Sequence, residues 1–298
     1  MQKYDVAYTI DSNYQIPFCC SLTSLLETNN ELVNDVYVIQ NQKSSDTPVM
    51  EQIRKFIKSD YGRVIIDVVI DHSDYSKFRF SGHVSTVAYY IFSIADYLPQ
   101  NASRVLYLDP DTIITSKLSL LENLQFGERD FLFAIDHGKL SFERLKKYCP
   151  DILNYFNGGV LFLNLPFWRE KDISKGFWQY ANNRPDDLKF WNQDILNIVL
   201  HNKWKELPYS YNAYDIKQKL SYTPHIIHYT GNRKPWNYFC DHPYKGFYWE
   251  VLKKTPFNRY VGIKRLFGNI ITPLLLPIVN LKNKFHSAPF TFMSKGEN

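Results

Sequence analysis

Apolar residues follow two alternating patterns along the first 110 residues of the chain. Short runs of β-branched and aromatic residues, typical of strands, alternate with longer segments whose apolar residues have helical spacing. The expected strands cover residues 3–10, 35–40, 63–71 and 105–108, and the expected helices cover residues 16–27, 47–59 and 84–97. Strands and helices that alternate in this way predict βαβ units and a parallel sheet.

The pattern is less regular in the rest of the chain. Further strands are expected at residues 131–135, 159–163 and 225–229, and further helices at residues 173–182 and 193–200. We therefore expect an α/β fold with a Rossmann-like, mostly parallel sheet flanked by helices and a mixed second half. The expected organisation is one domain over residues 1–250, followed by a tail over residues 251–298.

Two carboxylates, Asp109 and Asp111, follow the expected strand 105–108 directly. Buried parallel strands present functional residues at their C-terminal edge. Two like charges this close repel each other unless a cation lies between them, and oxygen ligands suit a hard divalent metal such as Mn²⁺ or Mg²⁺ that also binds a phosphate. A turn with two solvated aspartates is the alternative.

A second group of polar residues follows the expected strand 225–229. His228 precedes Gly231 by three residues, and Lys234 comes three residues later, before Pro235 and Trp236. Imidazole is a good Mn²⁺ ligand, glycine lets the backbone approach a phosphate closely, and lysine binds phosphate as a point charge. Together with the two aspartates, this spacing indicates a site that holds a metal ion and a diphosphate.

The pair of motifs resembles glycosyltransferase family 8, the retaining sugar-nucleotide transferases that include bacterial lipopolysaccharide galactosyl- and glucosyltransferases and glycogenin. The resemblance covers about residues 3–237, with the motifs in the family's order. It implies a GT-A fold and transfer of glucose or galactose from a UDP-sugar to a glycan, glycolipid or glycoprotein. It also implies Mn²⁺, with Mg²⁺ as the substitute, held by Asp109, Asp111 and His228, while Gly231 and Lys234 bind the diphosphate.

The segment after the first expected strand is similar to the family's nucleotide-base loop. The resemblance implies donor contacts from Thr9, Asp11, Asn13 and Tyr14, with the tyrosine ring stacked on the uracil. The alternative is a polar strand-to-helix turn in which Ser12 or Asn13 caps the helix.

Three further residues match family positions that face the donor sugar. Asn157 and Gly158 precede the expected strand 159–163 and resemble an Asn-x-Gly entry whose amide contacts the sugar. Asp136, after the expected strand 131–135, matches an aspartate that faces the sugar hydroxyls. Two glycines before a buried strand also fit a plain bulge or turn.

Asn192, Gln193 and Asp194 resemble the family's Asp-Gln-Asp segment at a helix start. The resemblance implies that Gln193 lies under the anomeric carbon, where an amide dipole stabilises developing positive charge. Asp194 alternatively serves as a first-turn acidic residue favoured by the helix dipole. Asn192 replaces the family's more usual aspartate, a change that affects recognition of the donor hydroxyls.

A second departure lies in the expected helix 84–97. Ile91 occupies a position where the family typically has an arginine that reaches the nucleotide. Isoleucine offers neither charge nor hydrogen bond, so Lys77 or Arg79 is the candidate replacement cation, unless donor affinity is lower or the site is impaired.

The formal net charge of +5 is concentrated at the end of the chain. Residues 251–298 carry eight Lys or Arg against one Glu, a net charge of +7, interleaved with aromatic residues. This composition favours attachment to an anionic membrane surface, with a helix packed on the main domain as the alternative. No nucleic-acid motif accompanies the basic segment, so we expect no nucleic-acid partner.

Cysteine usage and the first residues bear on the compartment. The four cysteines include the adjacent Cys19 and Cys20 and form no Cys-x-x-Cys motif, and the sequence as given enters a strand without an apolar signal region. We therefore expect a reduced, cytoplasmic protein, peripheral to the inner face of the plasma membrane if the tail binds lipid.

Two other functions compete with hexosyl transfer. Asp109, Asp111 and Thr112 also fit the nucleophile loop of haloacid-dehalogenase-type phosphohydrolases. Three strands precede it here, however, whereas in that class the loop follows the first strand. The departures at Ile91 and Asn192 motivate a non-catalytic sugar-nucleotide or glycan-binding relative.

Overall fold

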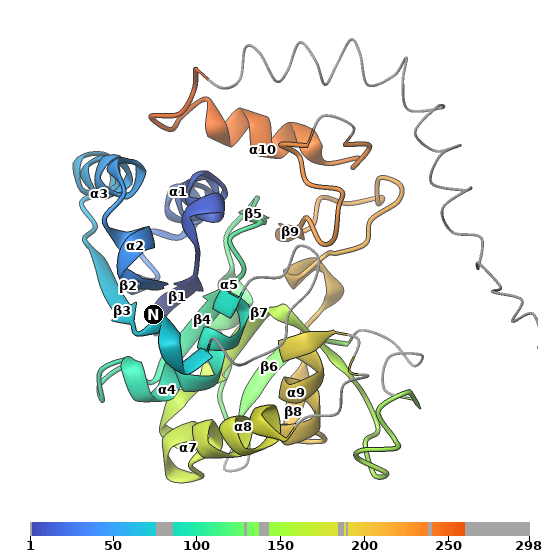
Figure 1. The fold of residues 1–298 in the computed structure, drawn as a ribbon. Coiled ribbons are helices and arrows are strands. Elements are labelled where there is room, and N and C mark those ends of the chain that lie inside the picture. The colour runs from blue at the N-terminus through green and yellow to red at the C-terminus, as the bar shows by residue number, and fades with distance from the viewer. Residues whose placement is uncertain are drawn as a thin grey trace, which may run out of the picture.

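The computed structural model describes residues 2–75, 86–127, 130–136, 143–183, 188, 190–237 and 240–259. Its centre is a seven-stranded sheet with the strand order β3-β2-β1-β4-β7-β6-β8 (Figure 1). Four of the strand pairs are parallel, and β7 is antiparallel to both of its neighbours. This mixed, mostly parallel arrangement confirms the fold class that the sequence predicts.

The first half of the chain builds the parallel part of the sheet. Its strands are β1 (Tyr4–Thr9), β2 (Val33–Asn41), β3 (Ile65–Ile70) and β4 (Arg104–Leu108). Between them lie α1 (Gln15–Asn29), α2 (Gln42–Ser45), α3 (Pro48–Tyr61) and α4 (Ile94–Tyr97). Thr47 caps α3 by accepting a hydrogen bond from the Met50 N–H, and Gly62 ends the helix in the left-handed region.

The expected helix over residues 84–97 is present in its described part, residues 86–97, but only its last turn is an α-helix. Thr86–Ser93 form a 3-10 helix, and only Ile94–Tyr97 are α-helical. The 3-10 segment contains the run Tyr89, Tyr90, Ile91 and Phe92, all fully buried. Aromatic and β-branched residues lose side-chain freedom in an α-helix, so burial determines the conformation of this segment more than helix propensity does.

The second half completes the sheet and adds helices to both of its faces. Its strands are β6 (Leu132–Asp136), β7 (Phe156–Asn164) and β8 (Trp204–Glu206). Its helices are α5 (Ser119–Asn123), α7 (Leu165–Glu170), α8 (Ile173–Asn182), α9 (Trp191–Val199) and α10 (Lys245–Leu252). The predicted helices over residues 173–182 and 193–200 are confirmed.

The expected strand 225–229 lies outside the main sheet. The observed strand β9 (Ile226–His228) pairs with β5 (Thr112–Ile114) in a separate antiparallel sheet of two strands. Thr112 lies opposite His228 in this register. The short β5 therefore brings the segment after Asp109 and Asp111 beside the histidine.

Two hydrophobic cores lie on opposite faces of the large sheet. Alternate residues of β4 point to opposite faces: Leu106 and Leu108 belong to the core under α1, α3 and α10, and Val105 and Tyr107 to the core under α4, α7, α8 and α9 (Figure 1). The first core also includes Val251, Leu252 and Phe257, so the described chain packs on this domain as far as Phe257.

The rest of the expected tail, residues 260–298, lies outside the described residues. Among the helices that the structure describes, none has the length and apolar character needed to cross a bilayer.

Candidate active site

Four chain segments meet at one edge of the fold. The Asp109 N–H donates to the Gly159 carbonyl at 2.7 Å, which joins the end of β4 to β7. The Tyr229 N–H donates to the Asp111 carbonyl at 3.0 Å, which joins the turn after β4 to the end of β9. Backbone hydrogen bonds thus fix Asp109 and Asp111 beside His228, although more than a hundred residues of sequence separate the aspartates from the histidine.

The three side chains form a compact group of potential metal ligands. One donor atom from each of Asp109, Asp111 and His228 lies within 4.8 Å of the other two. His228 Nε2 is 3.2 Å from Asp111 Oδ1 and 3.6 Å from Asp109 Oδ2. Asp111 Oδ1 is buried and accepts no hydrogen bond from the residues that the structure describes, so a cation at this position would satisfy it.

A buried network orients the imidazole. His228 Nδ1 lies 2.9 Å from Asn212 Oδ1, so the ring donates its Nδ1 proton to this amide oxygen. The Asn212 amide in turn donates to Asn157 Oδ1 at 2.9 Å, and Asn157 Oδ1 also accepts the Gly159 N–H at 3.0 Å. This arrangement aims Nε2 at both carboxylates, as the outer partners of metal-bound histidines commonly do.

Lys234 supplies a positive charge next to the group. Its ammonium contacts Asp111 Oδ2 and donates to the Tyr229 carbonyl at 2.6 Å. Burial raises the pKa of Asp111, but Lys234 and His228 outweigh this effect and hold the pKa below its usual value. Burial lowers the pKa of His228, but Asp111 and Asp109 outweigh it and raise the pKa to about 9.

Gly159 is required by the closeness of its neighbours. A β-carbon at this position would lie 2.1 Å from His228 Cε1 and 2.6 Å from Asp109 Oδ2. Any larger residue would therefore displace two of the three candidate ligands. The adjacent Gly158 tolerates a β-carbon better, with its nearest contact at 3.5 Å from Leu196 Cδ1.

We expect Asn212→Ala to weaken metal binding by about 10- to 100-fold, because it removes the acceptor that orients His228. Metal titration followed by calorimetry measures the change. Asn123→Ala is the matched control, because this exposed amide donates to the Ser119 carbonyl of its own helix and to no other group among the described residues. Equal metal affinity in the Asn212 variant and the control would show that the network does not orient the ligand.

The segment after β1 lies next to this group of residues. Tyr14 packs edge-on against Trp236 with a centroid separation of 6.0 Å, and the Lys234 ammonium is 5.9 Å from the Tyr14 ring centroid. Asp11 caps the 3-10 helix Ser12–Tyr14 by accepting the Asn13 N–H at 2.9 Å. The cap is therefore Asp11 rather than Ser12 or Asn13.

Thr9 is buried and reaches the acidic pair through a tyrosine. Its hydroxyl lies 2.8 Å from the Tyr107 hydroxyl, which donates to Asp109 Oδ1 at 3.0 Å. The contact orients the Asp109 carboxylate from behind. Side chains alternate along a strand, so residues two apart point to the same side. The two-residue spacing of Tyr107 and Asp109 is therefore a sequence signal from which their contact could be predicted.

Both polar atoms of the Gln193 side-chain amide form hydrogen bonds. Its Oε1 accepts the Gly158 N–H at 2.8 Å, and its Nε2 donates to the Tyr155 hydroxyl at 3.0 Å. That hydroxyl donates to Asp194 Oδ1 at 2.6 Å, and Asp194, which is fully buried, forms an ion pair with Arg144. Asp194 thus anchors the start of α9 through a buried ion pair rather than serving only as a first-turn acidic residue.

The two departures from the family pattern lie close together. The Asn192 amide donates to the Ala88 carbonyl at 2.8 Å, a bond that an ionised aspartate cannot make. Ala88 belongs to the same 3-10 helix as Ile91, which is fully buried among apolar neighbours. The candidate replacement cations Lys77 and Arg79 lie outside the described residues.

Asp136 and Gly231 are the two remaining residues for which the sequence predicts contacts with the donor. Asp136 ends β6 opposite Phe156, and its carbonyl accepts the Tyr214 hydroxyl at 3.1 Å. Gly231 has φ 63°, a left-handed conformation that disfavours a β-carbon. The residues that sequence reasoning missed are Tyr107, Arg144, Tyr155, Gly159 and Asn212, which position the candidates by contact rather than by sequence motif.

The fold and the acidic edge at the end of β4 define a glycosyltransferase of the GT-A class. The model of the family described as "Glycosyl transferase family 8" matches residues 5–240. The chain belongs to this family, as its sequence motifs predict, and is a glycosyltransferase.

Relatives with similar sequences extend over most of the chain. General stress protein A of Bacillus subtilis is 29% identical over 285 residues, which cover 87% of this chain and 97% of the relative. Lipopolysaccharide 1,2-glucosyltransferase of Escherichia coli is 27% identical, and lipopolysaccharide 1,3-galactosyltransferase of Salmonella typhimurium is 25% identical; each match covers 86% of this chain and 80% of the relative.

Solved structures show the same fold. The galactosyltransferase LgtC, crystallised with donor and acceptor sugar analogs, superimposes with a TM-score of 0.73 at 21% identity, covering 85% of this chain and 96% of LgtC. Family membership excludes the phosphohydrolase alternative, because Asp109 and Asp111 follow the fourth strand of a GT-A sheet.

Proposed function

We propose that this glycosyltransferase moves a hexose, glucose or galactose, from a UDP-sugar to an acceptor hydroxyl with retention of anomeric configuration. The observation that carries the proposal is the convergence of Asp109, Asp111 and His228 beside Lys234. Two carboxylates, an imidazole and an ammonium at one strand edge suit a metal-bound diphosphate. The lipopolysaccharide glucosyl- and galactosyltransferases among the relatives support a hexose donor.

The three candidate ligands fit Mn²⁺, with Mg²⁺ as the substitute. Carboxylate oxygens and a neutral imidazole are suitable donors. Asp111 Oδ1 has no hydrogen-bond partner within the described part of the chain, and this atom and the tight approach at Gly159 both point to a shared position between the ligands. When bound, the metal supplies Lewis-acid stabilisation of the departing diphosphate.

The chain's own residues then complete the donor site. We assign Lys234 and the Gly231 backbone to the diphosphate, and Asn157, Gly158 and Asp136 to the sugar. Thr9, Asp11, Asn13 and Tyr14 bind the nucleoside, and Thr9 also orients Asp109 through Tyr107. The position of Tyr14 beside the Lys234 ammonium supports this order along the donor.

Gln193 and Asn192 complete the proposed catalytic face. The Gln193 carbonyl, held in place by Gly158 and Tyr155, stabilises positive charge at the anomeric carbon. In the proposed front-face route, the acceptor oxygen bonds to the anomeric carbon as the bond to the diphosphate oxygen breaks, and the hydroxyl proton leaves with the diphosphate. The proposed acceptors are a glycan, a glycolipid or a glycoprotein.

A screen of UDP-sugars for UDP release tests this function. We expect release from UDP-glucose or UDP-galactose in Mn²⁺, stimulated by acceptor and suppressed by EDTA. A folded protein that binds UDP-sugars but releases no UDP in any combination would favour the non-catalytic alternative.

Metal affinity should rise with pH, because His228 must lose its proton to bind a metal. The ordinary imidazole pKa is near 6.5, and the neighbouring carboxylates raise that of His228 to about 9. Below the raised pKa, the proton competes with the metal, so affinity should increase by up to about tenfold per pH unit between about pH 6 and pH 8. Mn²⁺ titrations across this range measure the slope, and His228→Ala should flatten it. An equally steep slope in that variant would remove His228 from the metal site.

We also propose that the basic segment 251–298 holds the enzyme on an anionic membrane at the cytoplasmic face, near lipid-linked acceptors. Its net charge of +7 supports this, because each basic residue near the surface contributes about 1 kcal/mol. Full-length protein should co-sediment with anionic vesicles at low salt, and a version ending at Arg259 should bind more weakly. Failure of both to bind would indicate that the tail does not attach to membranes.

A further inference from the structure

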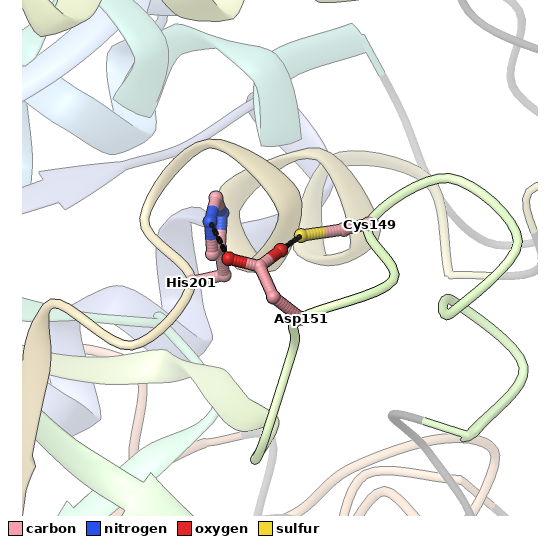
Figure 2. Close-up of side chains that lie close together, drawn as sticks. All are labelled: Cys149, Asp151 and His201. Carbon is pink, nitrogen blue, oxygen red and sulfur yellow. Dashed lines mark hydrogen bonds and ion pairs between the residues drawn. The ribbon is translucent and has the colours of Figure 1, made fainter.

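A second group of metal-ligand side chains lies away from the acidic edge, between the loop before β7 and the end of α9. It consists of Cys149, Asp151 and His201, whose donor atoms all lie within 4.8 Å of one another. Figure 2 shows the Asp151 carboxylate between the other two side chains. The Cys149 thiol donates to Asp151 Oδ1 at 3.3 Å, and His201 Nε2 is 3.5 Å from Asp151 Oδ2.

The neighbouring residue Asn202 holds the two segments together. It adopts φ 56°, in the left-handed region, and its amide donates to the Asp151 carbonyl at 2.7 Å. Its Oδ1 accepts the Leu153 N–H at 3.1 Å. The Asn202 side chain thus joins the residue after His201 to the backbone of Asp151 and Leu153, so contacts outside the cluster also hold the two segments together.

The imidazole of His201 is already oriented for a cation. Its Nδ1 lies 2.6 Å from the Ile198 carbonyl and therefore donates its proton there. In the neutral ring, the Nε2 lone pair then faces a carboxylate oxygen, and two lone pairs in contact repel unless a cation lies between them. Histidines that bind metals are commonly oriented by this kind of carbonyl contact.

We propose that Cys149, Asp151 and His201 form a site for a zinc-like divalent transition metal, separate from the donor site. Thiolate, imidazole and carboxylate are the donors that zinc takes in proteins, and its bonds of about 2.0–2.3 Å place tetrahedral ligand atoms about 3.3–3.6 Å apart. The observed separations, 3.3 Å from Cys149 Sγ to Asp151 Oδ1 and 3.5 Å from His201 Nε2 to Asp151 Oδ2, are of this size. Water or another ligand takes the fourth position.

The nearest lysines in the sequence contact other groups. Lys146 is paired with Glu143 at 2.9 Å, and the Lys147 ammonium lies 4.7 Å from the Tyr148 ring centroid. Binding involves no change of oxidation state: the thiol proton of Cys149 passes to solvent, and the sulfur bonds to the metal. Burial and the Asp151 carboxylate raise the pKa of this thiol to about 11.

Metal at this position would link two elements that carry candidate donor residues. The loop leads into β7, which begins with Phe156 and contains Asn157 and Gly158, while α9 begins at Trp191 and contains Gln193. Asn197 already joins them by exchanging hydrogen bonds with the Phe156 backbone at 2.7 and 2.9 Å. The added link would stabilise the folded state by mass action.

Cobalt and zinc titrations of the reduced, metal-free, full-length protein test the proposal. An Asp109→Asn/Asp111→Asn double variant removes the carboxylates of the other group, so it should bind one equivalent of Co²⁺ at the proposed site. This bound Co²⁺ should show thiolate-to-metal charge-transfer absorption. Cys149→Ser should abolish this band, and Cys240→Ser, which removes another buried thiol, should preserve it. Zinc should raise the melting temperature.

Two further variants guard against a folding defect. Asp151→Asn alters a carboxylate that is 74% exposed, and His201→Gln removes the imidazole; each should weaken zinc binding more than about tenfold with the fold retained. The exposed Asp60→Asn serves as a charge-matched control. Absence of the charge-transfer band in the folded double variant, or unchanged zinc affinity in the Asp151 and His201 variants, would overturn the proposal.

Discussion

Asp111→Asn is expected to reduce sugar transfer by about a thousandfold, or roughly 4 kcal/mol of transition-state stabilisation. The substitution removes a buried negative charge that contacts both His228 and Lys234. The proposed metal would lose an anionic ligand, and Lys234 would lose its partner. Initial rates of UDP release at saturating donor and Mn²⁺ measure the effect.

Asp60→Asn is the control for this prediction. Asp60 is exposed near the end of α3, so its loss of charge should leave the rate within about twofold. A transfer rate in Asp111→Asn equal to that of the control would remove the carboxylate from the donor site.

Gly159→Ala is expected to lower metal affinity more than a hundredfold and to reduce transfer with it. The added β-carbon would overlap His228 Cε1 at 2.1 Å and Asp109 Oδ2 at 2.6 Å. The backbone cannot easily move away, because β7 is paired on both sides and the Gly159 carbonyl accepts the Asp109 N–H. Mn²⁺ titration and the melting temperature together separate loss of the metal from loss of the fold.

Gly246→Ala is the matched glycine control, because a β-carbon there has no neighbour within 4 Å among the described residues and Gly246 lies in α10. This variant should retain metal affinity and transfer. Normal metal affinity in Gly159→Ala would mean that the close approach at β7 has no part in metal binding.

The periodicity of apolar residues predicts the long strands of the main sheet better than the short elements around it. Strands such as β1 and β4 are buried runs of strand-forming residues, which the sequence displays directly. β5 has only three residues, and its partner β9 is more than a hundred residues away, so local sequence carries little signal for their pairing. The 3-10 helix over Thr86–Ser93 likewise depends on its surroundings.

The residues of the candidate active site likewise divide into those that the sequence predicts and those that only the structure reveals. Asp109, Asp111 and His228 were identifiable because chemically meaningful residues follow apolar runs, and the structure brings all three together. Asn212 and Tyr155 were not, because nothing in their local sequence marks them. Their importance comes from hydrogen bonds to His228 and Gln193 that exist only after folding.

Calorimetric titration of UDP into the full-length protein, with and without Mn²⁺, tests most directly whether Asp109, Asp111 and His228 form a metal-diphosphate site. We predict that UDP binds tightly only with Mn²⁺ and that Asp109→Asn, Asp111→Asn and His228→Ala each weaken this metal-dependent binding. Uridine, which lacks the diphosphate, should show no response to the metal. UDP affinity that is the same with Mn²⁺ and with EDTA, or unchanged in all three variants, would contradict the assignment.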